Sequence, residues 1–348
     1  MNARPLSPRH ARHAGQASRG AALISAMITV TLVATLASAA LWQQWRHVEI
    51  ESAERSRAQT AWLLTGALDF SRLILREDKG PADHLAEPWA LGLQESKLSS
   101  FLSQDKQVRE GDPEVYLSGA ITDAQSRLNV LNLAPNGQAS QSGWASFVKL
   151  FNLLGLPLNE LQTLQQQLLR AQQASAPTTG NSASPSSAAN TALAPLMPQN
   201  TSQLVWLGVS ARTVAQLAPF VTVLPQPTPL NLNTAGPEAI YASLPGLDMA
   251  AAQQFVRQRA NQAPLESLEA ASQALGLRGA QALNAQWFSI NTQYFFIRGR
   301  MRLQDTVQED DLLVERNGRK VSILWRDRAV SNPALTARHA GLLQSSPP

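Results

Sequence analysis

The chain has 348 residues, a formal net charge of +4 and no cysteine. Disulfides, thiolate catalysis and cysteine–zinc sites are therefore excluded. Four arginines and no acid lie in residues 1–20, so the rest of the chain is near neutral and its basic pI does not indicate nucleic-acid binding. The five histidines are scattered without the spacing of metal ligands.

An apolar run without any charged residue covers residues 21–41, directly after Arg19 and Gly20. At 1.5 Å per residue a helix of this length spans about 31 Å, close to the roughly 30 Å of a bilayer core. Trp42 and Trp45 follow, where aromatic anchors meet the membrane surface. Because the basic residues precede the run, we expect a single-pass anchor with a cytoplasmic N-terminus and the rest of the chain outside the cytoplasm.

Three interpretations of this N-terminus compete: a plain anchor, a secretory signal peptide cut after the small residues Ala37-Ser38-Ala39, and a prepilin-type leader cut between Gly20 and Ala21. A glycine directly before the apolar run has no role in a secretory signal, whose cut lies after that run. The helical pattern also continues beyond the membrane. We therefore predict that residues 1–20 are a cleaved leader and that Ala21 begins the mature chain.

A single long helix is expected from residue 21 to 76, because no proline occurs between Ala21 and Lys79. Such a helix would be roughly 84 Å long. Its second half carries apolar residues at steps of three and four, the spacing of one helix face, and we expect this half to pack on a soluble domain. The residues of this pattern are Trp62, Leu63, Gly66, Ala67, Phe70, Leu73 and Ile74.

Strand patterns lie on both sides of a central helical region. Residues 115–121 and 127–133 read as two strands of a hairpin around the turn 123–126. Near the C-terminus, Asn317-Gly318 is a strong hairpin signal. The strands expected there are 294–303, 312–316 and 320–325.

The central region, residues 141–283, has leucine stripes at helical spacing and is expected to be an all-α domain. We predict helices over 240–244, 250–259 and 265–275, with Asn233 or Thr234 capping the first. Residues 174–202 are uncharged and rich in small polar residues, which cannot bury enough apolar surface to offset their ordering entropy. We expect this tract to be a flexible loop.

The predicted fold class is α+β: a long pilin-like helix and an antiparallel sheet, interrupted by the inserted all-α domain. The sheet domain would comprise residues 77–140 and 284–328, and residues 329–348 would be a disordered tail. Two domains in tandem are the alternative, but the first hairpin alone would make a poor sheet.

Several segments, taken in this order, carry a family resemblance. They are Arg19-Gly20 before the anchor, Glu87-Pro88-Trp89-Ala90, Ile121-Thr122-Asp123, Arg127-Leu128-Asn129-Val130-Leu131-Asn132, Leu230-Asn231-Leu232-Asn233-Thr234-Ala235, and the strand 289–296. Together they resemble the K-type minor pseudopilins of bacterial type II secretion systems, the general secretion pathway protein K family.

The resemblance implies a non-enzymatic subunit at the tip of the periplasmic pseudopilus, which helps to export folded proteins across the outer membrane. Its partners would be the I- and J-type minor pseudopilins, other pseudopilins and the prepilin peptidase. The anchor would lie in the bacterial inner membrane, with the bulk of the chain in the periplasm. The family is also linked to calcium, which makes calcium a candidate cofactor by resemblance.

Ser25 is the fifth residue of the mature chain if Ala21 is the first. Most members of the wider pilin superfamily carry a glutamate at that position, where it neutralises the N-terminal amine of the subunit above. A buried carboxylate without this partner would be costly. We interpret Ser25 as the residue of a subunit that has no subunit above it, rather than as a merely tolerated residue in a membrane helix.

A second interpretation is a membrane-anchored, competence-type DNA-binding protein, because Leu244 to Asp248 resembles a helix-hairpin-helix turn. Asp248 stands where a DNA-binding hairpin needs glycine, so its carboxylate would repel phosphate. Arg257 and Arg259 alone are a thin electrostatic footprint. We therefore expect no nucleic-acid partner.

Catalytic and metal-site patterns are weaker still. The sequence has no Gly-rich phosphate loop, no Gly-x-Ser-x-Gly and no cluster of histidine with carboxylates, so we expect no enzyme. The densest acidic group reads as a solvated loop, and we assign no metal ligand to it. Its members are Asp305, Glu309, Asp310 and Asp311.

Overall fold

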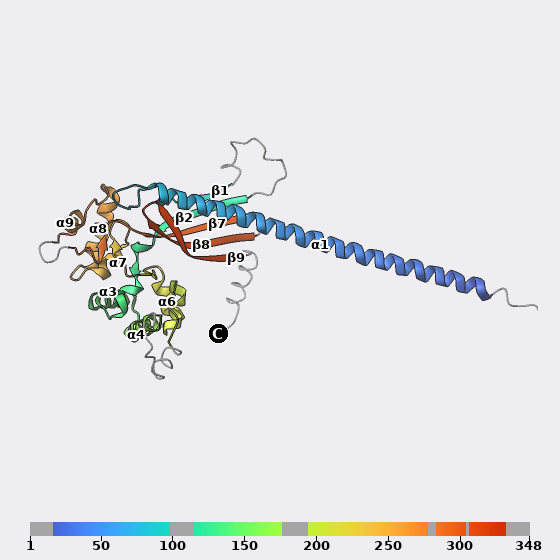
Figure 1. The fold of residues 1–348 in the computed structure, drawn as a ribbon, viewed down its shortest axis with the longest axis horizontal. Coiled ribbons are helices and arrows are strands. Elements are labelled where there is room, and N and C mark those ends of the chain that lie inside the picture. Colours follow the sequence, from blue (N-terminus) through green and yellow to red (C-terminus); the bar gives the residue numbers. More distant parts are fainter. Residues whose placement is uncertain (1–16, 98–114, 176–193, 278–282, 304–305, 332–348) are drawn as a thin grey trace, which may run out of the picture. The chain divides into compact units, whose positions relative to one another are not determined.

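The computed structural model describes residues 17–97, 115–175, 194–277, 283–303 and 306–331 (Figure 1). The chain divides into two compact units, residues 1–62 and 63–348. Helix α1 (Ala17–Glu77) confirms the predicted uninterrupted helix. Within the described residues, α1 is the one helix long and apolar enough to cross a membrane, with a mean hydropathy of 2.0 in its most apolar window.

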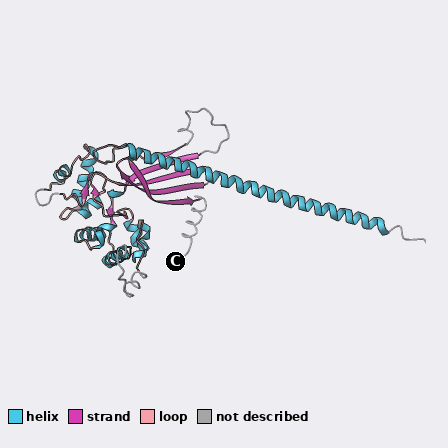
Figure 2. Cartoon of the chain, in the orientation of Figure 1, coloured by secondary structure: helices cyan, strands magenta, loops and turns pink. Residues whose placement is uncertain are grey.

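The second unit contains a five-stranded antiparallel sheet in the order β1-β2-β7-β8-β9. In Figure 2 the long strands (magenta) gather in one part of this unit and the short helices (cyan) in the other. Gly318, with a φ of +57°, forms the predicted turn between the last two strands. The strands are β1 (Leu93–Lys97), β2 (Val115–Asp123), β7 (Tyr294–Leu303), β8 (Thr306–Asn317) and β9 (Lys320–Ser331).

The predicted hairpin of residues 115–133 is wrong. The neighbours of β2 are β1 and β7, and β1 is a strand that was not predicted from the sequence. Only β3 (Leu128–Asn129) is extended in the second predicted strand, and it pairs in parallel with β4 (Val221–Thr222). The chain then turns into a 3-10 helix, η3 (Val130–Leu133), because the side chain of Asn129 accepts a hydrogen bond from the backbone N–H of Leu131.

Helix α1 packs on the sheet through a different face from the one predicted. Leu64, Leu68 and Leu75 are buried against the sheet. Gly299 of β7 allows the close approach, because a Cβ at this glycine would lie 2.8 Å from Cδ1 of Leu64. The expected face, by contrast, has only Ala67 and Ile74 partly buried against the core, and Leu63, Gly66, Phe70 and Leu73 are exposed.

The chain between the adjacent strands β2 and β7, residues 124–293, forms a helical insertion, which confirms the predicted interruption of the sheet. Its helices are α3 (Gln141–Leu154), α4 (Leu158–Ser175), α6 (Ala211–Leu217), α7 (Pro237–Ser243), α8 (Met249–Asn261) and α9 (Leu268–Ala274). Further short elements are the 3-10 helices η2 (Ala124–Ser126), η4 (Pro135–Gly137) and η5 (Thr201–Leu207) and the parallel pair β5 (Leu230–Asn231) and β6 (Phe288–Ser289). Outside the insertion, η1 (Pro88–Ala90) follows α1.

Two hydrophobic clusters fill the insertion. The first joins α3, α4, η5 and α6 and includes Phe147, Leu164 and Leu207. The second joins α7, α8, α9 and β6 and includes Ile240 and Phe255. The predicted helices 240–244, 250–259 and 265–275 correspond to α7, α8 and α9. The cap of α7 differs from the prediction, because the N-cap is Gly236, which has no side chain to make a capping hydrogen bond. The side chains of Asn233 and Thr234 do not cap the helix, since they bond to Leu265 and Asp123 instead.

Two segments that were expected to be irregular are partly ordered. At the ends of the 174–202 tract, residues 174–175 belong to α4 and residues 201–202 to η5. Met197 packs against the first cluster. At the C-terminus, residues 329–331 lie in β9. Residues 176–193 and 332–348 of these segments lie outside the described residues.

Two glycines provide a test of how α1 packs: Gly299 of β7, which lies against the buried face of the helix, and Gly66, which lies on its exposed face. Gly299→Ala places a Cβ against Leu64, so we expect the free energy of unfolding to fall by about 1–2 kcal/mol. Gly66→Ala meets no atom within 4 Å and removes the entropic penalty of a mid-helix glycine, so the free energy of unfolding should rise by up to about 1 kcal/mol. Urea unfolding measures both. A stabilising Gly299→Ala change would contradict this packing.

Candidate functional site

A buried carboxylate joins the sheet to the helical insertion. Asp123, the last residue of β2, accepts hydrogen bonds from the backbone N–H of Gln125 (2.7 Å), from Nδ2 of Asn231 (2.8 Å) and from the hydroxyl of Thr234. These three donors are neutral. Burial raises the pKa of Asp123 to about 6, although the hydrogen bonds, which favour the charged form, act in the opposite direction.

A second polar cluster continues from this point through Asn231, whose Nδ2 also donates to the backbone carbonyl of Asp83 (3.1 Å). The guanidinium of Arg316 in β8 donates to the carboxylates of Asp83 and Asp78, the latter at 2.6 Å. Burial raises the pKa of Asp83, and the Arg316 charge opposes that rise. The segment after α1 is thereby tied to the sheet and to the insertion.

Asp78, Asp83 and Glu87 bring carboxylate oxygens within 4.8 Å of one another, the arrangement of a candidate metal site. Their oxygens already have partners. Arg316 occupies Asp78 and Asp83, and Glu87 accepts from Nε1 of Trp89 (2.5 Å). A calcium ion, which takes six to eight oxygen ligands, would have to displace Arg316. We therefore assign no metal ligand among the described acidic residues.

The acidic group near the C-terminus is a strand rather than the expected loop. Glu309, Asp310 and Asp311 lie in β8, and Asp305 lies outside the described residues. Asp310 is fully buried and paired with Arg326 and Arg328 of β9. Glu309 and Asp311 form ion pairs with Arg300 and Arg298 of the neighbouring strand β7. The alternation of acids with arginines on neighbouring strands, rather than ion binding, explains this charge density.

The side chains of two asparagines of the Arg127–Asn132 segment act as clamps, because they form hydrogen bonds with the backbone of a neighbouring segment. Asn129 donates to the carbonyl of Gln226 (2.7 Å) and accepts from the N–H of Leu224 (3.3 Å). Asn132 exchanges two hydrogen bonds with the backbone of Thr228, at 2.9 and 3.1 Å. Both amides are thereby engaged within the chain. Their role is to hold the segment 224–228 against η3.

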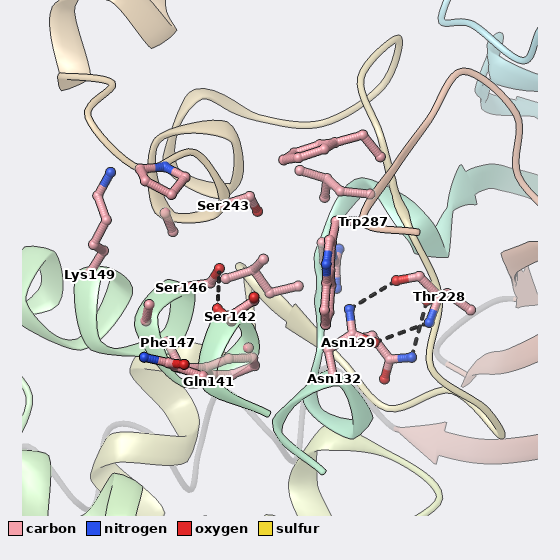
Figure 3. A pocket seen from close by; sticks show the side chains of 18 residues that line it. Asn129, Asn132, Gln141, Ser142, Ser146, Phe147, Lys149, Thr228, Ser243 and Trp287 are labelled. Carbon is pink, nitrogen blue, oxygen red and sulfur yellow. Dashed lines mark hydrogen bonds between the residues drawn. The ribbon is translucent and has the colours of Figure 1, made fainter. Parts of the chain in front are cut away.

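A cavity of about 380 Å³ lies beside these clamps, between α3 and the segment before β6. Figure 3 shows Ser142, Ser146 and Lys149 of α3 on one side and Trp287 on the other. The lining includes two cations, Arg127 and Lys149, and no acid. Burial lowers the pKa of both. Backbone carbonyls hold the Lys149 ammonium, as described below.

The helix-hairpin-helix turn between α7 and α8 uses two of its charged groups in hydrogen bonds within the chain. Asp248 is the N-cap of α8 and accepts from the N–H of Ala251 at 2.7 Å. Arg259 donates to the backbone carbonyl of Leu232, and burial lowers its pKa to about 10. Arg257 is exposed. One of the two arginines considered for phosphate binding therefore serves the fold.

The exposed side of α1 outside the apolar run is a candidate docking surface that the structure adds. We define the outer face of α1 as Leu63, Gly66, Phe70 and Leu73. Phe70 is 62% exposed, and Leu63 and Leu73 are about 40% exposed. No atom lies within 4 Å of a Cβ placed at Gly66, so nothing in the described part of this chain requires a glycine there. The sequence pattern contained this face but assigned it to the core.

The predicted N-terminal site residues all belong to α1, and nothing in the structure tests their role. Gly20 and Ala21 lie near its beginning. Ser25 is exposed and its hydroxyl donates to the carbonyl of Ala22 at 2.9 Å, within the helix. No partner group from outside the helix is therefore needed to satisfy this hydroxyl.

Comparisons with known proteins agree with the resemblance seen in the sequence. Two family models, both described as type II secretion system (T2SS) protein K, match residues 126–226 and 230–291. The type II secretion system protein K of Pseudomonas aeruginosa is 24% identical over 308 residues, covering 83% of this chain and 86% of the relative. That of Klebsiella pneumoniae is 24% identical over 339 residues, covering 88% of this chain and 95% of the relative.

A solved structure shares the fold. A chain in the crystal structure of the GspK–GspI–GspJ complex from the enterotoxigenic Escherichia coli type 2 secretion system matches with a TM-score of 0.52 and 19% identity. The match covers 80% of this chain and 99% of that chain.

The raised pKa of Asp123 predicts a pH dependence of stability. Because the folded state binds this proton more tightly than the unfolded chain, whose Asp pKa is 3.8, stability from this group is greatest at low pH and falls as the pH rises from about 4 to about 6. The loss is of the order of 3 kcal/mol. Asp123→Asn, which does not titrate, should lack this fall, whereas exposed Asp327→Asn should keep it. Urea unfolding between pH 4 and 7.5 compares the three proteins, and parallel profiles would contradict the assignment.

Proposed function

We propose a function that starts from family membership, since the chain belongs to the type II secretion system protein K family of minor pseudopilins. The proposed role is a non-enzymatic subunit at the tip of the periplasmic pseudopilus, which helps to export folded proteins across the outer membrane. Its single anchor would lie in the inner membrane, with the N-terminus in the cytoplasm and the bulk of the chain in the periplasm.

The helical insertion is the observation that carries this proposal. It separates β2 from β7, two strands that are hydrogen-bonded neighbours, and it is fixed to the sheet through Asp123 rather than hanging from a loose linker. Pilin-like subunits stack through their long helices. A rigidly attached insertion of this size hinders the addition of another subunit, whose globular domain (its head) would have to lie directly above it. A subunit with such an insertion is therefore best accommodated at the end of the filament.

Two features of the N-terminus support the same position. We propose that prepilin peptidase cuts between Gly20 and Ala21, so that Ser25 becomes the fifth residue. Ser25 satisfies its own hydroxyl within α1. It supplies no carboxylate for the N-terminal amine of a subunit above, and at the tip no such amine is present.

The proposed partners are the I- and J-type minor pseudopilins, because the related crystal structure is that of a complex of GspK with GspI and GspJ. We expect apolar contacts along α1, beginning near Ile24, Ile28 and Leu32 in the apolar run, which are exposed in the structure. The outer face of α1 extends such contacts into the periplasmic part. Gly66 would allow a partner helix to approach closely, as small residues do at helix crossings.

The alternative function, DNA binding through the α7–α8 turn, receives no support from the geometry. Asp248 places a carboxylate at the start of α8, and Arg259 binds a backbone carbonyl instead of facing solvent. A phosphate approaching this turn would meet the negative charge of Asp248.

The docking prediction concerns the outer face of α1. Phe70→Ser in the periplasmic part of the chain, from about Glu49 onward, should weaken assembly with the I- and J-type domains by at least about tenfold, because a buried aromatic side chain at an interface is a typical hot spot. Gly66→Leu should weaken it as well, although a Cβ at this position meets no atom of this chain within 4 Å. Size-exclusion chromatography and calorimetry measure the complex.

The matched control is Trp206→Ser, which removes another exposed aromatic side chain, in η5. It should leave assembly unchanged. If Trp206→Ser weakens the complex while Phe70→Ser and Gly66→Leu do not, the partners bind the insertion and this docking face is wrong.

A further inference from the structure

The turn between α7 and α8 leaves backbone carbonyls without their helical partners. The carbonyl of Tyr241 would normally accept from the residue four positions on, but that residue is Pro245, which has no N–H. The carbonyls of Leu244, the C-cap of α7, and of Leu247, which precedes the N-cap of α8, lie outside the regular helices, and Leu244 accepts a long hydrogen bond from the N–H of Leu247 (3.4 Å). Unpaired carbonyls at a helix C-terminus also carry partial negative charge, which favours a cation.

Lys149, from α3, supplies that cation. Its Nζ donates to the carbonyls of Tyr241 (2.5 Å), Leu244 (2.8 Å) and Leu247 (3.3 Å). It also lies 4.1 Å from the centre of the Tyr241 ring, a cation–π contact. An ammonium has three N–H donors, and here each donor meets one carbonyl. Figure 3 shows Lys149 beside the cavity, extending from α3 away from Ser142 and Gln141.

The neighbourhood of this ammonium is built for a cation without a carboxylate. None of the ion pairs in the described part of the chain involves Lys149. Three convergent carbonyl oxygens and a ring face are the kind of ligands that also replace the hydration shell of K⁺ in proteins. Because no carboxylate is among these groups, the site lacks the negative charge that divalent-ion sites usually include, and a monovalent cation fits it better.

We propose that the carbonyls of Tyr241, Leu244 and Leu247 form a monovalent-cation cage that this chain fills with its own Lys149, and that shortening Lys149 opens the cage to K⁺ or a small alkylammonium ion from solution. The tethered ammonium makes the wild-type turn independent of external ions. It also links α3 to the turn between α7 and α8, where Ala242 of α7 packs in the first cluster and Ile240 and Leu244 pack in the second. The cage thus adds a polar link to the apolar contact between α3 and α7.

The test compares thermal unfolding of the full chain in detergent, as wild type and as Lys149→Ala, in chlorides of tetramethylammonium, potassium and n-propylammonium at equal ionic strength. Lys149→Ala should lower Tm by on the order of 5 °C in tetramethylammonium, because three carbonyls lose their donors. Propylammonium, which has the size of the removed group, should restore at least half of that loss, and potassium part of it. Wild type and the exposed control Lys320→Ala should show no difference between propylammonium, potassium and tetramethylammonium.

The same Tm for Lys149→Ala in all three salts would overturn the proposal, as would a Tm equal to that of wild type in tetramethylammonium. If Lys149→Ala unfolds in tetramethylammonium, recovery of the fold in propylammonium supports the cage and failure to recover contradicts it. Lys149→Met provides a second measure: its side chain fills the cage without a donor, so its Tm should fall without any response to the salts. A wild-type Tm for Lys149→Met would also overturn the proposal.

Discussion

The buried carboxylate of Asp123 is the constraint on which the rest of the structure after α1 depends. Its partners Asn231 and Thr234 lie more than 100 residues away along the chain. A buried charge is tolerated only when its hydrogen bonds are made, so the end of β2 and the segment after β5 are held in one arrangement. The insertion is therefore a fixed part of the head, which is what a steric cap requires.

The same rule, that buried polar groups need partners, accounts for the other joints of the molecule. Arg316 neutralises Asp78 and Asp83 where the chain leaves α1, and Asn132 clamps the backbone of Thr228. Lys149 satisfies the carbonyl of Tyr241, which Pro245 leaves unpaired. In each of these contacts, a polar side chain of one segment forms a hydrogen bond or an ion pair with a backbone group or a charged side chain of another segment. Apolar clusters form the interior of the sheet domain and of the insertion, and these polar contacts fix how the segments are joined.

Short-range sequence patterns predicted much of the secondary structure, but few of the polar contacts between distant segments. The Asn317-Gly318 turn and helices α7 to α9 follow from short-range patterns, and the structure confirms them. The hairpin at 115–133 is wrong because the alternation there comes from Asn129 and Asn132, a buried and a partly buried polar residue whose partners are distant. The α1 face is wrong because both faces of the helix are apolar, and only the sheet decides which one is buried. The sequence signal for the outer face of α1 was the presence of apolar residues on two faces of the helix, since only one of these faces can pack on the sheet.

The central claim is that this subunit occupies the end of the pseudopilus. Since the chain contains no cysteine, Trp206→Cys provides a single thiol at an exposed position of the insertion, and a maleimide–gold label on it can be seen by electron microscopy of assembled pseudopili. A subunit that caps the filament gives one label per filament, located at one end. Labels repeated along the shaft would contradict the capping position.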